Sequence, residues 1–379
     1  MTQEKILEAL SNVQEPDLGK DLVTLNMIKD ISIDGNEVSF TVVLTTPACP
    51  MKDMIGNACK NAIKILVSKD AVVKVNFTSN TTSKRTDPGS VLPNVRNIIA
   101  VVSGKGGVGK STVAANLAIA LSQGGAKVGL MDADIYGPSV PIMFGVRGER
   151  PMMMDVGGDK ARPDDPVGRG MIAPLERYGI KLMSIGLLVD EKSAVVWRGP
   201  MASSAIRQFV TDVYWGELDY LVVDMPPGTG DIHLTLMQTV PVTGAVIVTT
   251  PQDVALADAK KGIAMFGQAQ MNVPIIGLVE NMSYFIPPTD VTELPGNKYY
   301  LFGKDGGKRL AEEYDLPFLG QIPLVQSICE GGDQGVPVMV SDDLISKKAF
   351  EEFANFVVRS VAMRNANIGS LKVAEVVNE

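Results

Sequence analysis

The sequence predicts an α/β protein in which helices cover both faces of a mostly parallel β-sheet, with a smaller α/β (α+β) domain before it. Beyond residue 96, apolar segments of strand length alternate with longer segments of helical periodicity, which is the order of parallel strand–helix units. A glycine-rich turn joins the first of these strands to the first helix. The 379 residues are 45% hydrophobic, which is enough for two domains with cores of their own.

Residues 1–80 have the pattern of the small domain. The apolar residues Ile6, Leu7 and Leu10 give a first helix a short hydrophobic face. Two alternating segments flank the turn Asp34-Gly35-Asn36 and predict a hairpin, and a helix and a third strand follow. These strands are expected over residues 27–33, 37–44 and 72–77, and the helix over residues 50–67. The next residues, 81–96, are polar and contain proline and glycine, so we expect a linker to a second domain over residues 97–379.

A phosphate-binding motif follows the first strand of the second domain, predicted over residues 97–102, and precedes a predicted helix. It matches G-x-x-x-x-G-K-[ST] without a mismatch. Glycines let successive N–H groups turn toward an anion, and the helix N-terminus adds partial positive charge. The expected ATP-binding residues are Gly104, Lys105, Gly106, Gly107, Val108, Gly109, Lys110, Ser111 and Thr112. Lys110 would reach the β- and γ-phosphates, Ser111 would ligate Mg²⁺, and Thr112 would support the α-phosphate.

Lys105 is a second lysine inside this loop. The sequence Gly-Lys-Gly-Gly-Val-Gly-Lys-Ser resembles the loop of the MinD/ParA/Mrp group of P-loop ATPases. The resemblance implies that Lys105 contacts the phosphates of a nucleotide bound by the other subunit of a dimer, and that it is catalytic together with Lys110. The alternative interpretation is that Lys105 is a solvated cation of the loop.

Acidic residues end two predicted strands of this domain. Asp132 and Asp134 follow a strand over residues 127–131, and Asp224 ends the apolar strand over residues 221–224. Because the carboxyl ends of parallel strands meet at one crevice, these side chains are expected to lie near the phosphates. We expect Asp134 to position or activate the attacking water, Asp132 to support Mg²⁺ through water, and Asp224 to lie near Mg²⁺. The alternative is that one of these acids caps a turn.

The segment after Asp224 predicts a second nucleotide-sensing switch, in which the N–H group of Gly228 could donate to the γ-phosphate. His233 is the only histidine, so it cannot join a histidine-based metal cluster, and we expect it on the helix after this switch. Two more buried strands are expected over residues 244–250 and 275–280.

Asn281 follows the second of these strands and falls where the MinD/ParA/Mrp group places an asparagine that contacts adenine. Asparagine at the end of a strand is also common in turns. Pro323, in Gln321-Ile322-Pro323, is expected to help close the base pocket through main-chain contacts.

Several phrases, in this order and spacing, resemble the Mrp/ApbC iron–sulfur cluster carrier ATPases across the whole chain. They are residues 105–111, 132–139, 197–201, 224–231, 250–256, 281–283, 302–303, 306–307 and 321–324. The resemblance implies a homodimer that hydrolyses ATP slowly with Mg²⁺ and passes clusters to apo iron–sulfur client proteins. Residues 15–23 and 45–50 resemble the MIP18-like domain, which is linked to iron–sulfur protein maturation.

The sequence departs from this family at the cluster ligands. Typical members carry Cys-x-x-Cys shortly after Asn-Met-Ser and share a 4Fe–4S cluster between two subunits, but residues 284–300 contain no cysteine. Cys49 is the best remaining candidate for a ligand. It precedes a predicted helix whose dipole would lower the pKa of a thiol, although a small buried residue is an equal alternative. Cys59 is expected in the core, and Cys329 stands alone.

Composition excludes several other classes. The formal net charge of −8 argues against nonspecific binding to nucleic acid or anionic membrane, and no apolar segment is long enough to span a bilayer. The three cysteines and the absence of a signal-peptide pattern favour a cytoplasmic protein. Two alternatives to cluster carriage stay open: a nucleotide-switched adaptor without a cluster, and a MinD/ParA-like positioning ATPase. The second would need a membrane or DNA surface, whereas the apolar face of the helix expected over residues 343–363 is more typical of core packing.

Overall fold

The computed structural model describes residues 1–83, 91–155, 170–189, 199–268, 271, 273–287 and 298–367. This part of the chain forms two compact units. The first comprises Met1–Ser83 and the end of the last helix from Val358 on, and the second extends from residue 91 to Val357. Parts of three predicted segments (the linker over residues 81–96, the phrase 197–201 and the stretch after Asn-Met-Ser) lie outside the described residues.

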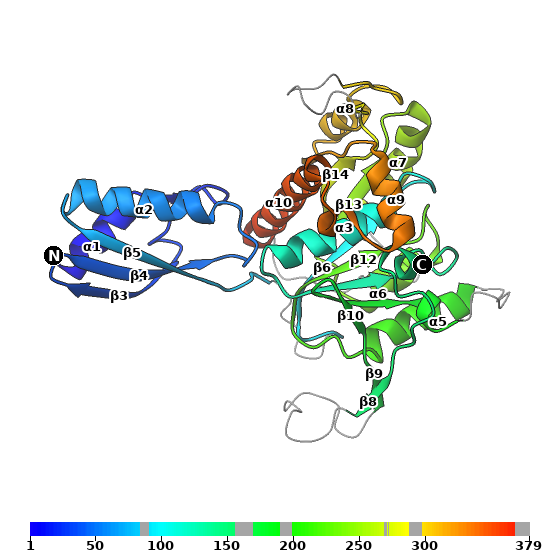
Figure 1. Cartoon of the computed structure of the whole chain (residues 1–379), viewed down its shortest axis with the longest axis horizontal. Helices are drawn as coiled ribbons and strands as arrows, with labels where there is room; N and C mark the ends of the chain where they lie inside the picture. Colours follow the sequence, from blue (N-terminus) through cyan, green and yellow to red (C-terminus); the bar gives the residue numbers. More distant parts are fainter. Residues whose placement is uncertain are drawn as a thin grey trace. The chain divides into compact units, whose positions relative to one another are not determined.

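The first unit is a three-stranded sheet packed against two helices (Figure 1). Strand β4 pairs with β3 in antiparallel fashion and with β5 in parallel, and helix α2 makes the crossover between β4 and β5. Val38, Phe40, Val42 and Leu44 alternate along β4 and are buried in the core. The elements are α1 (Gln3–Leu10), β1 (Gln14–Glu15), β2 (Lys20–Asp21), β3 (Ile28–Asp34), β4 (Glu37–Leu44), α2 (Lys52–Leu66) and β5 (Val72–Ser79). The predicted helices, hairpin and third strand are confirmed.

The second unit is built on an eight-stranded sheet of order β10-β11-β7-β12-β6-β13-β14-β15, in which only β10 is antiparallel to its neighbour. The predicted, mostly parallel sheet is therefore confirmed. Its strands are β6 (Val95–Val102), β7 (Val128–Asp132), β10 (Leu175–Arg177), β11 (Ile180–Ser184), β12 (Leu218–Asp224), β13 (Gly244–Thr249), β14 (Ile275–Glu280) and β15 (Phe318–Gln321). A separate two-stranded sheet pairs β8 (Met153–Asp155) with β9 (Gly170–Ile172).

Helices cover both faces of this sheet, as the alternation along β6 shows. Ile98, Ala100 and Val102 belong to one core cluster with residues of α5, α6, α7 and α8, whereas Ile99 and Val101 are buried on the other face, where α3 packs on the sheet. The helices are α3 (Lys110–Gln123), α4 (Val140–Met143), η1 (Ile185–Leu187), α5 (Gly199–Thr211), α6 (Asp231–Thr239), α7 (Asp253–Phe266), α8 (Gly306–Glu313), α9 (Gln326–Gln334), η3 (Val338–Val340) and α10 (Leu344–Asn367).

Helix α10 contributes to both units. Phe350, Phe353 and Val357 are buried, as a core-packing face predicts, although Phe356 is 43% exposed. From Val358 on, the helix belongs to the first unit, where the guanidinium of Arg359 donates to Asp17 at 2.6 Å. From the sequence we predicted that all of residues 97–379 belong to the second domain, and these domain limits remain a prediction. Within the described chain, no helix combines the length and apolarity that crossing a bilayer requires.

Candidate functional site

The phosphate loop connects β6 to α3 and contains glycines that the backbone requires. Gly107 and Gly109 have φ of +83° and +79°, in the left-handed region that disfavours other residues. A Cβ atom on Gly109 would lie 2.2 Å from the side-chain nitrogen of Asn281, and one on Gly104 would lie 2.2 Å from the backbone of Asp258 in α7. The loop is thus held between α7 and the end of β14, and its C-terminal residue Gly109 is the N-cap of α3.

Lys110 is the first residue of α3, and its ammonium group lies among three other site residues. It donates to the carboxylate of Asp224 and to the hydroxyl of Ser111 at 3.2 Å, and it lies 3.8 Å from a carboxylate oxygen of Asp134. The side chain is only 6% exposed, so these charges interact with little screening by water. The structure therefore brings the predicted lysine and two of the predicted acids together.

Asp132 and Asp224 lie opposite each other on the neighbouring parallel strands β7 and β12. Asp132 is completely buried, and it accepts hydrogen bonds from the Ser184 hydroxyl at 2.8 Å and from the N–H of Asp134 at 3.1 Å. Burial, together with the charge of Asp224, raises the pKa of Asp132. Asp134 in turn accepts from the N–H of Gly137 at 3.2 Å. Asp132, the last residue of β7, and Asp134 thus both accept N–H groups of the following turn, whereas the alternative interpretation gave a turn cap to one of them.

One oxygen of Asp224 is buried and has no hydrogen-bond partner in the described structure. Its other oxygen accepts from Lys110, whose neighbour Ser111 supplies a hydroxyl at the same place. Buried polar atoms are normally paired, and oxygen donors of this kind are the ligands that Mg²⁺ prefers. Ser111 and Asp224, two of the residues predicted for magnesium, therefore fit the ion, and Asp132 lies opposite Asp224 on the neighbouring strand.

The second switch is attached to the phosphate loop. Gly228 has a φ of +85°, and its N–H donates to the carbonyl of Ser103 at 2.9 Å. The Ser103 hydroxyl donates to the carbonyl of Lys105, also at 2.9 Å. The N–H group expected to reach a phosphate is therefore occupied by the loop itself. The side chain of Lys105 is half-buried and forms no ion pair within the described part of the chain.

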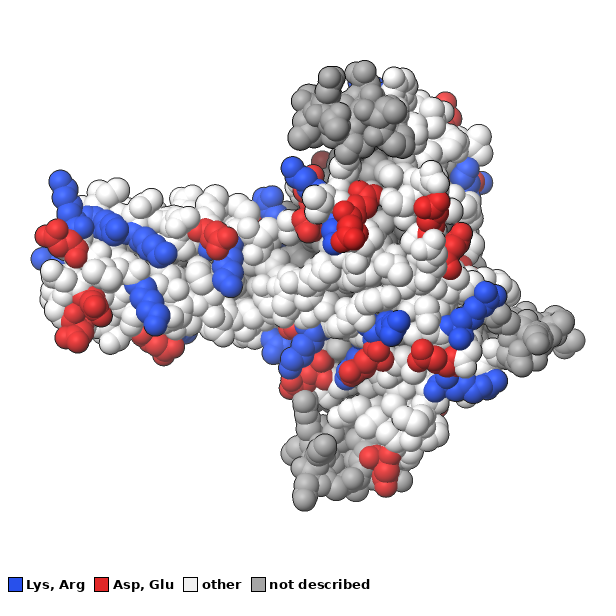
Figure 2. Space-filling view, viewed as in Figure 1, with Lys and Arg blue, Asp and Glu red and all other residues white. Residues whose placement is uncertain are grey.

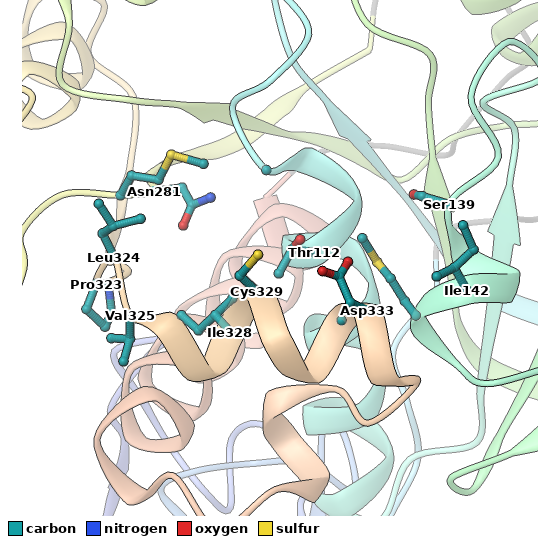
Figure 3. Close-up of a pocket in the computed structure, with 14 residues that line it drawn as sticks. Thr112, Ser139, Ile142, Asn281, Pro323, Leu324, Val325, Ile328, Cys329 and Asp333 are labelled. Atoms are coloured by element: carbon teal, nitrogen blue, oxygen red, sulfur yellow. The ribbon is translucent and has the colours of Figure 1, made fainter.

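A cavity of about 300 Å³ opens beside the loop, between α3, α4 and α9. Figure 3 shows Asn281, Pro323 and Leu324 on one side of it and Ser139 and Ile142 on the other, with Thr112 and Cys329 between them. The amide of Asn281 donates to the Val108 carbonyl at 2.8 Å, which fixes the side chain against the loop. Two residues predicted to contact a base thus line one cavity next to the predicted phosphate site. The presence of Cys329 in this cavity was not predicted.

Glu280 is a structural residue of the site that was not predicted from the sequence. It is completely buried and accepts hydrogen bonds from the Ser283 hydroxyl, the N–H of Gly307 and the side chain of Gln321. It thereby joins the ends of β14 and β15 to the start of α8, and these strand ends carry Asn281 and Pro323. The one sequence feature that indicated this role is that Glu280 is the single acidic residue of the otherwise apolar strand β14.

Cys49 lies in the first unit, just before α2, and the expected direction of its pKa shift was wrong. The helix start was expected to lower the pKa of the thiol, but burial raises it, and the carboxylates of Glu15 and Asp17 add to the increase. Arg359 and the N–H of Met51 act in the opposite direction and do not compensate. Within the described residues, no three side chains among His, Cys, Asp and Glu are placed to hold a metal ion.

His233 lies on the first turn of α6, as predicted, and is 1% exposed. Burial lowers its pKa from 6.5 to about 4, and the nearby charge of Lys110 contributes. Between these values the unfolded chain binds a proton that the folded protein does not, so stability falls as the pH decreases. We expect urea unfolding to show a loss approaching about 3 kcal/mol from pH 7 to pH 4 in the wild type relative to His233→Gln, which has no imidazole. Parallel pH profiles of the two proteins would contradict this assignment.

Comparisons with known proteins cover both units. The family model described as NUBPL iron-transfer P-loop NTPase matches residues 94–358, and the model described as iron–sulfur cluster assembly protein matches residues 3–77. The chain is 49% identical over 365 residues to the iron–sulfur cluster carrier protein of Synechocystis sp., covering 96% of this chain and 99% of that protein. It is 44% identical over 360 residues to the iron–sulfur cluster carrier protein of Deinococcus radiodurans, with 95% of each covered.

Among solved structures, a nucleotide-binding protein from Archaeoglobus fulgidus in complex with ADP is similar to this chain. The TM-score is 0.53 and the identity is 40%, over 65% of this chain and 88% of that one. The family model that matches residues 94–358 thus extends across the part of the chain that contains the phosphate loop, both acidic strand ends and the cavity.

Proposed function

Because this chain belongs to the NUBPL iron-transfer P-loop NTPases, we propose that it binds and hydrolyses ATP and that it carries iron–sulfur clusters to apoproteins. It acts as a homodimer in the cytoplasm, its hydrolysis is slow, and it requires Mg²⁺. The observation that supports the nucleotide part of this proposal best is the convergence of Lys110 with Asp134 and Asp224 at the first turn of α3. A buried lysine at the end of a glycine loop is the partner that a phosphate chain needs.

Each residue around the loop has a separate proposed role in ATP hydrolysis. Mg²⁺, held by Ser111, Asp224 and a water on Asp132, would neutralise charge on the phosphates. Asp134 positions the attacking water, and because burial raises its pKa, its carboxylate is a better proton acceptor than a solvated one. Lys105 reaches the nucleotide of the other subunit, and Asn281 and Pro323 hold the adenine in the cavity next to the loop.

The cluster is the cargo of this protein, and its ligands are proposed from the three cysteines of the chain. Cys59 is completely buried in the core of the first unit and burial raises its pKa to about 12, which excludes it as an accessible thiolate. Cys49 is half-buried and Cys329 is exposed. We place the cluster on Cys49 of two subunits, because Cys49 belongs to the unit that matches the iron–sulfur cluster assembly model. Since the pKa of Cys49 is raised, iron binding there must release a proton and should strengthen as the pH rises.

The test is iron and sulfide content, with the visible absorption spectrum, after anaerobic reconstitution of the wild type, Cys49→Ala and Cys329→Ala. We expect iron on the wild type and on Cys329→Ala, loss of it on Cys49→Ala, and more iron at pH 8.5 than at pH 6.5. Cys329→Ala is the matched control because it removes the other thiol that solvent can reach. Loss of iron from Cys329→Ala and not from Cys49→Ala would show that Cys329, and not Cys49, is the cluster ligand. Absence of iron from all three proteins, with ATPase activity intact, would contradict cluster carriage and favour the alternative of a nucleotide-switched adaptor without a cluster.

A positioning ATPase that binds membrane or DNA is the remaining candidate, and no observation favours it. On the face shown in Figure 2, lysines and arginines are interspersed with acidic side chains and do not form a patch of one sign. Such a patch is what anionic lipids or nucleic acid would need. Co-sedimentation with liposomes or DNA in the presence of ATP would reverse this preference.

A further inference from the structure

His233 faces back from α6 onto the segment that joins β12 to α6, residues 225–230. The N–H group of Gly230, the N-cap residue of α6, donates to Nδ1 of the imidazole at 3.3 Å. A ring nitrogen that accepts a hydrogen bond carries no proton, so the proton of the neutral ring is on Nε2. The ring is therefore a hydrogen-bond acceptor at one edge and a donor at the other.

The donor edge is not satisfied. Nε2 is buried and has no hydrogen-bond partner in the described structure. The backbone carbonyl of Pro226 lies close enough to the imidazole to oppose the fall in the histidine pKa, while Nε2 completes no hydrogen bond to it or to any other group of the described structure. The imidazole is thus bonded through Nδ1 to Gly230 at the end of the segment, whereas its Nε2–H group has no partner in the described structure. A buried donor without a partner is unfavourable, so a conformation that completes this bond would be favoured.

Gly228 lies between the two ends, and it is the residue that nucleotide binding is expected to move. Its N–H now donates to the Ser103 carbonyl, so it must leave that acceptor before it can reach a terminal phosphate. Pro226 and Pro227 restrict the backbone before it, which makes that half of the segment stiff. Rotation must then occur at Gly228 and Gly230, and because these glycines lie between Pro226 and α6, it changes the position of the Pro226 carbonyl relative to the imidazole of His233.

We propose that His233 is a positioning residue of the second switch: it stays bonded to Gly230 and closes its Nε2–H onto the Pro226 carbonyl when Gly228 moves from Ser103 to the terminal phosphate of ATP. The inference rests on the proposed nucleotide function and extends it. The ATP-bound arrangement gains one satisfied buried donor that the nucleotide-free and ADP-bound arrangements lack. His233 therefore contributes to the preference for ATP over ADP without touching the nucleotide.

The test compares the wild type with His233→Phe, which keeps the ring volume without polar atoms, and with His233→Gln, which keeps an acceptor and a donor. We expect affinity for ADP to stay within about twofold in all three, and affinity for a non-hydrolysable ATP analogue to fall about tenfold in His233→Phe. His233→Gln should recover part of this loss. Equal losses for ADP and the analogue would show a structural role alone and would overturn the proposal.

A second measurement needs no variant, since His233 is the only histidine and gives the only imidazole signals. Nitrogen NMR of the wild type should show an unprotonated Nδ1 throughout, with a shift of the Nε2–H signal to a hydrogen-bonded value with the ATP analogue and not with ADP. Identical Nε2–H signals in both complexes would refute the inference while the nucleotide function stands. A wild type that binds neither nucleotide would instead refute the proposed function, and the inference with it.

Discussion

Lys110→Ala is expected to weaken ATP binding by about 100-fold or more, because the phosphates lose their buried cationic partner. The geometry makes the loss larger than the removal of one contact. The ammonium group bonds to Asp224 and lies 3.8 Å from Asp134, so its removal leaves these carboxylates without their cation beside the loop. An anionic ligand would then meet uncompensated negative charge. Equilibrium titration with ATP and Mg²⁺ measures the effect.

Lys127→Ala is the matched control, since it removes the same charge from an exposed lysine paired with Glu217 at 3.0 Å. We expect its ATP affinity to stay within about twofold of the wild type, as surface pairs contribute little. Circular dichroism separates loss of binding from loss of fold in Lys110→Ala. A folded Lys110→Ala protein with wild-type affinity would show that this loop does not hold the phosphates.

Local pattern predicted the parts of the site that lie on consecutive residues. The glycine motif, the acids that end β7 and β12, and the strand–loop–helix context all follow from residue types at fixed spacing. Asn281 and Pro323 came from resemblance, and the structure places both on the cavity beside the loop. These assignments needed no knowledge of contacts between distant residues.

What the sequence did not predict depends on such contacts. The bond from Gly228 to Ser103 joins residues that only the parallel pairing of β6 and β12 brings together. The pKa of Cys49 was assigned in the wrong direction because the helix start is visible in the sequence, whereas its burial and the carboxylates of Glu15 and Asp17 are not. The bond between Arg359 and Asp17 joins residues near opposite ends of the chain, and neither has a local signal for it.

Lys105→Ala should retain most of the ATP affinity of the wild type, lose hydrolysis by about 100-fold and lose ATP-dependent dimerisation. The reason is the role proposed for Lys105, which is to donate to the phosphates of the nucleotide in the other subunit during the reaction. The side chain of Lys105 is half-buried and has no ion pair among the described residues, so its removal leaves no buried carboxylate uncompensated. This difference from Lys110 is the reason for expecting binding to survive. ATP binding by titration, turnover by phosphate release and ATP-dependent dimerisation by sedimentation measure the three effects.

Mixing the two lysine variants distinguishes action on the other subunit from action on the same one. In a mixed dimer, the Lys110→Ala subunit cannot hold ATP but still offers Lys105, and the Lys105→Ala subunit holds ATP but lacks its own Lys105. If Lys105 acts across the dimer, the mixture hydrolyses ATP although each variant alone does not. If Lys105 acts within its own subunit, no site in the mixed dimer has both lysines and the mixture stays inactive. Normal turnover by Lys105→Ala alone would contradict a catalytic role of Lys105 in either subunit. Lys105 would then be a solvated cation of the loop, which is the alternative interpretation.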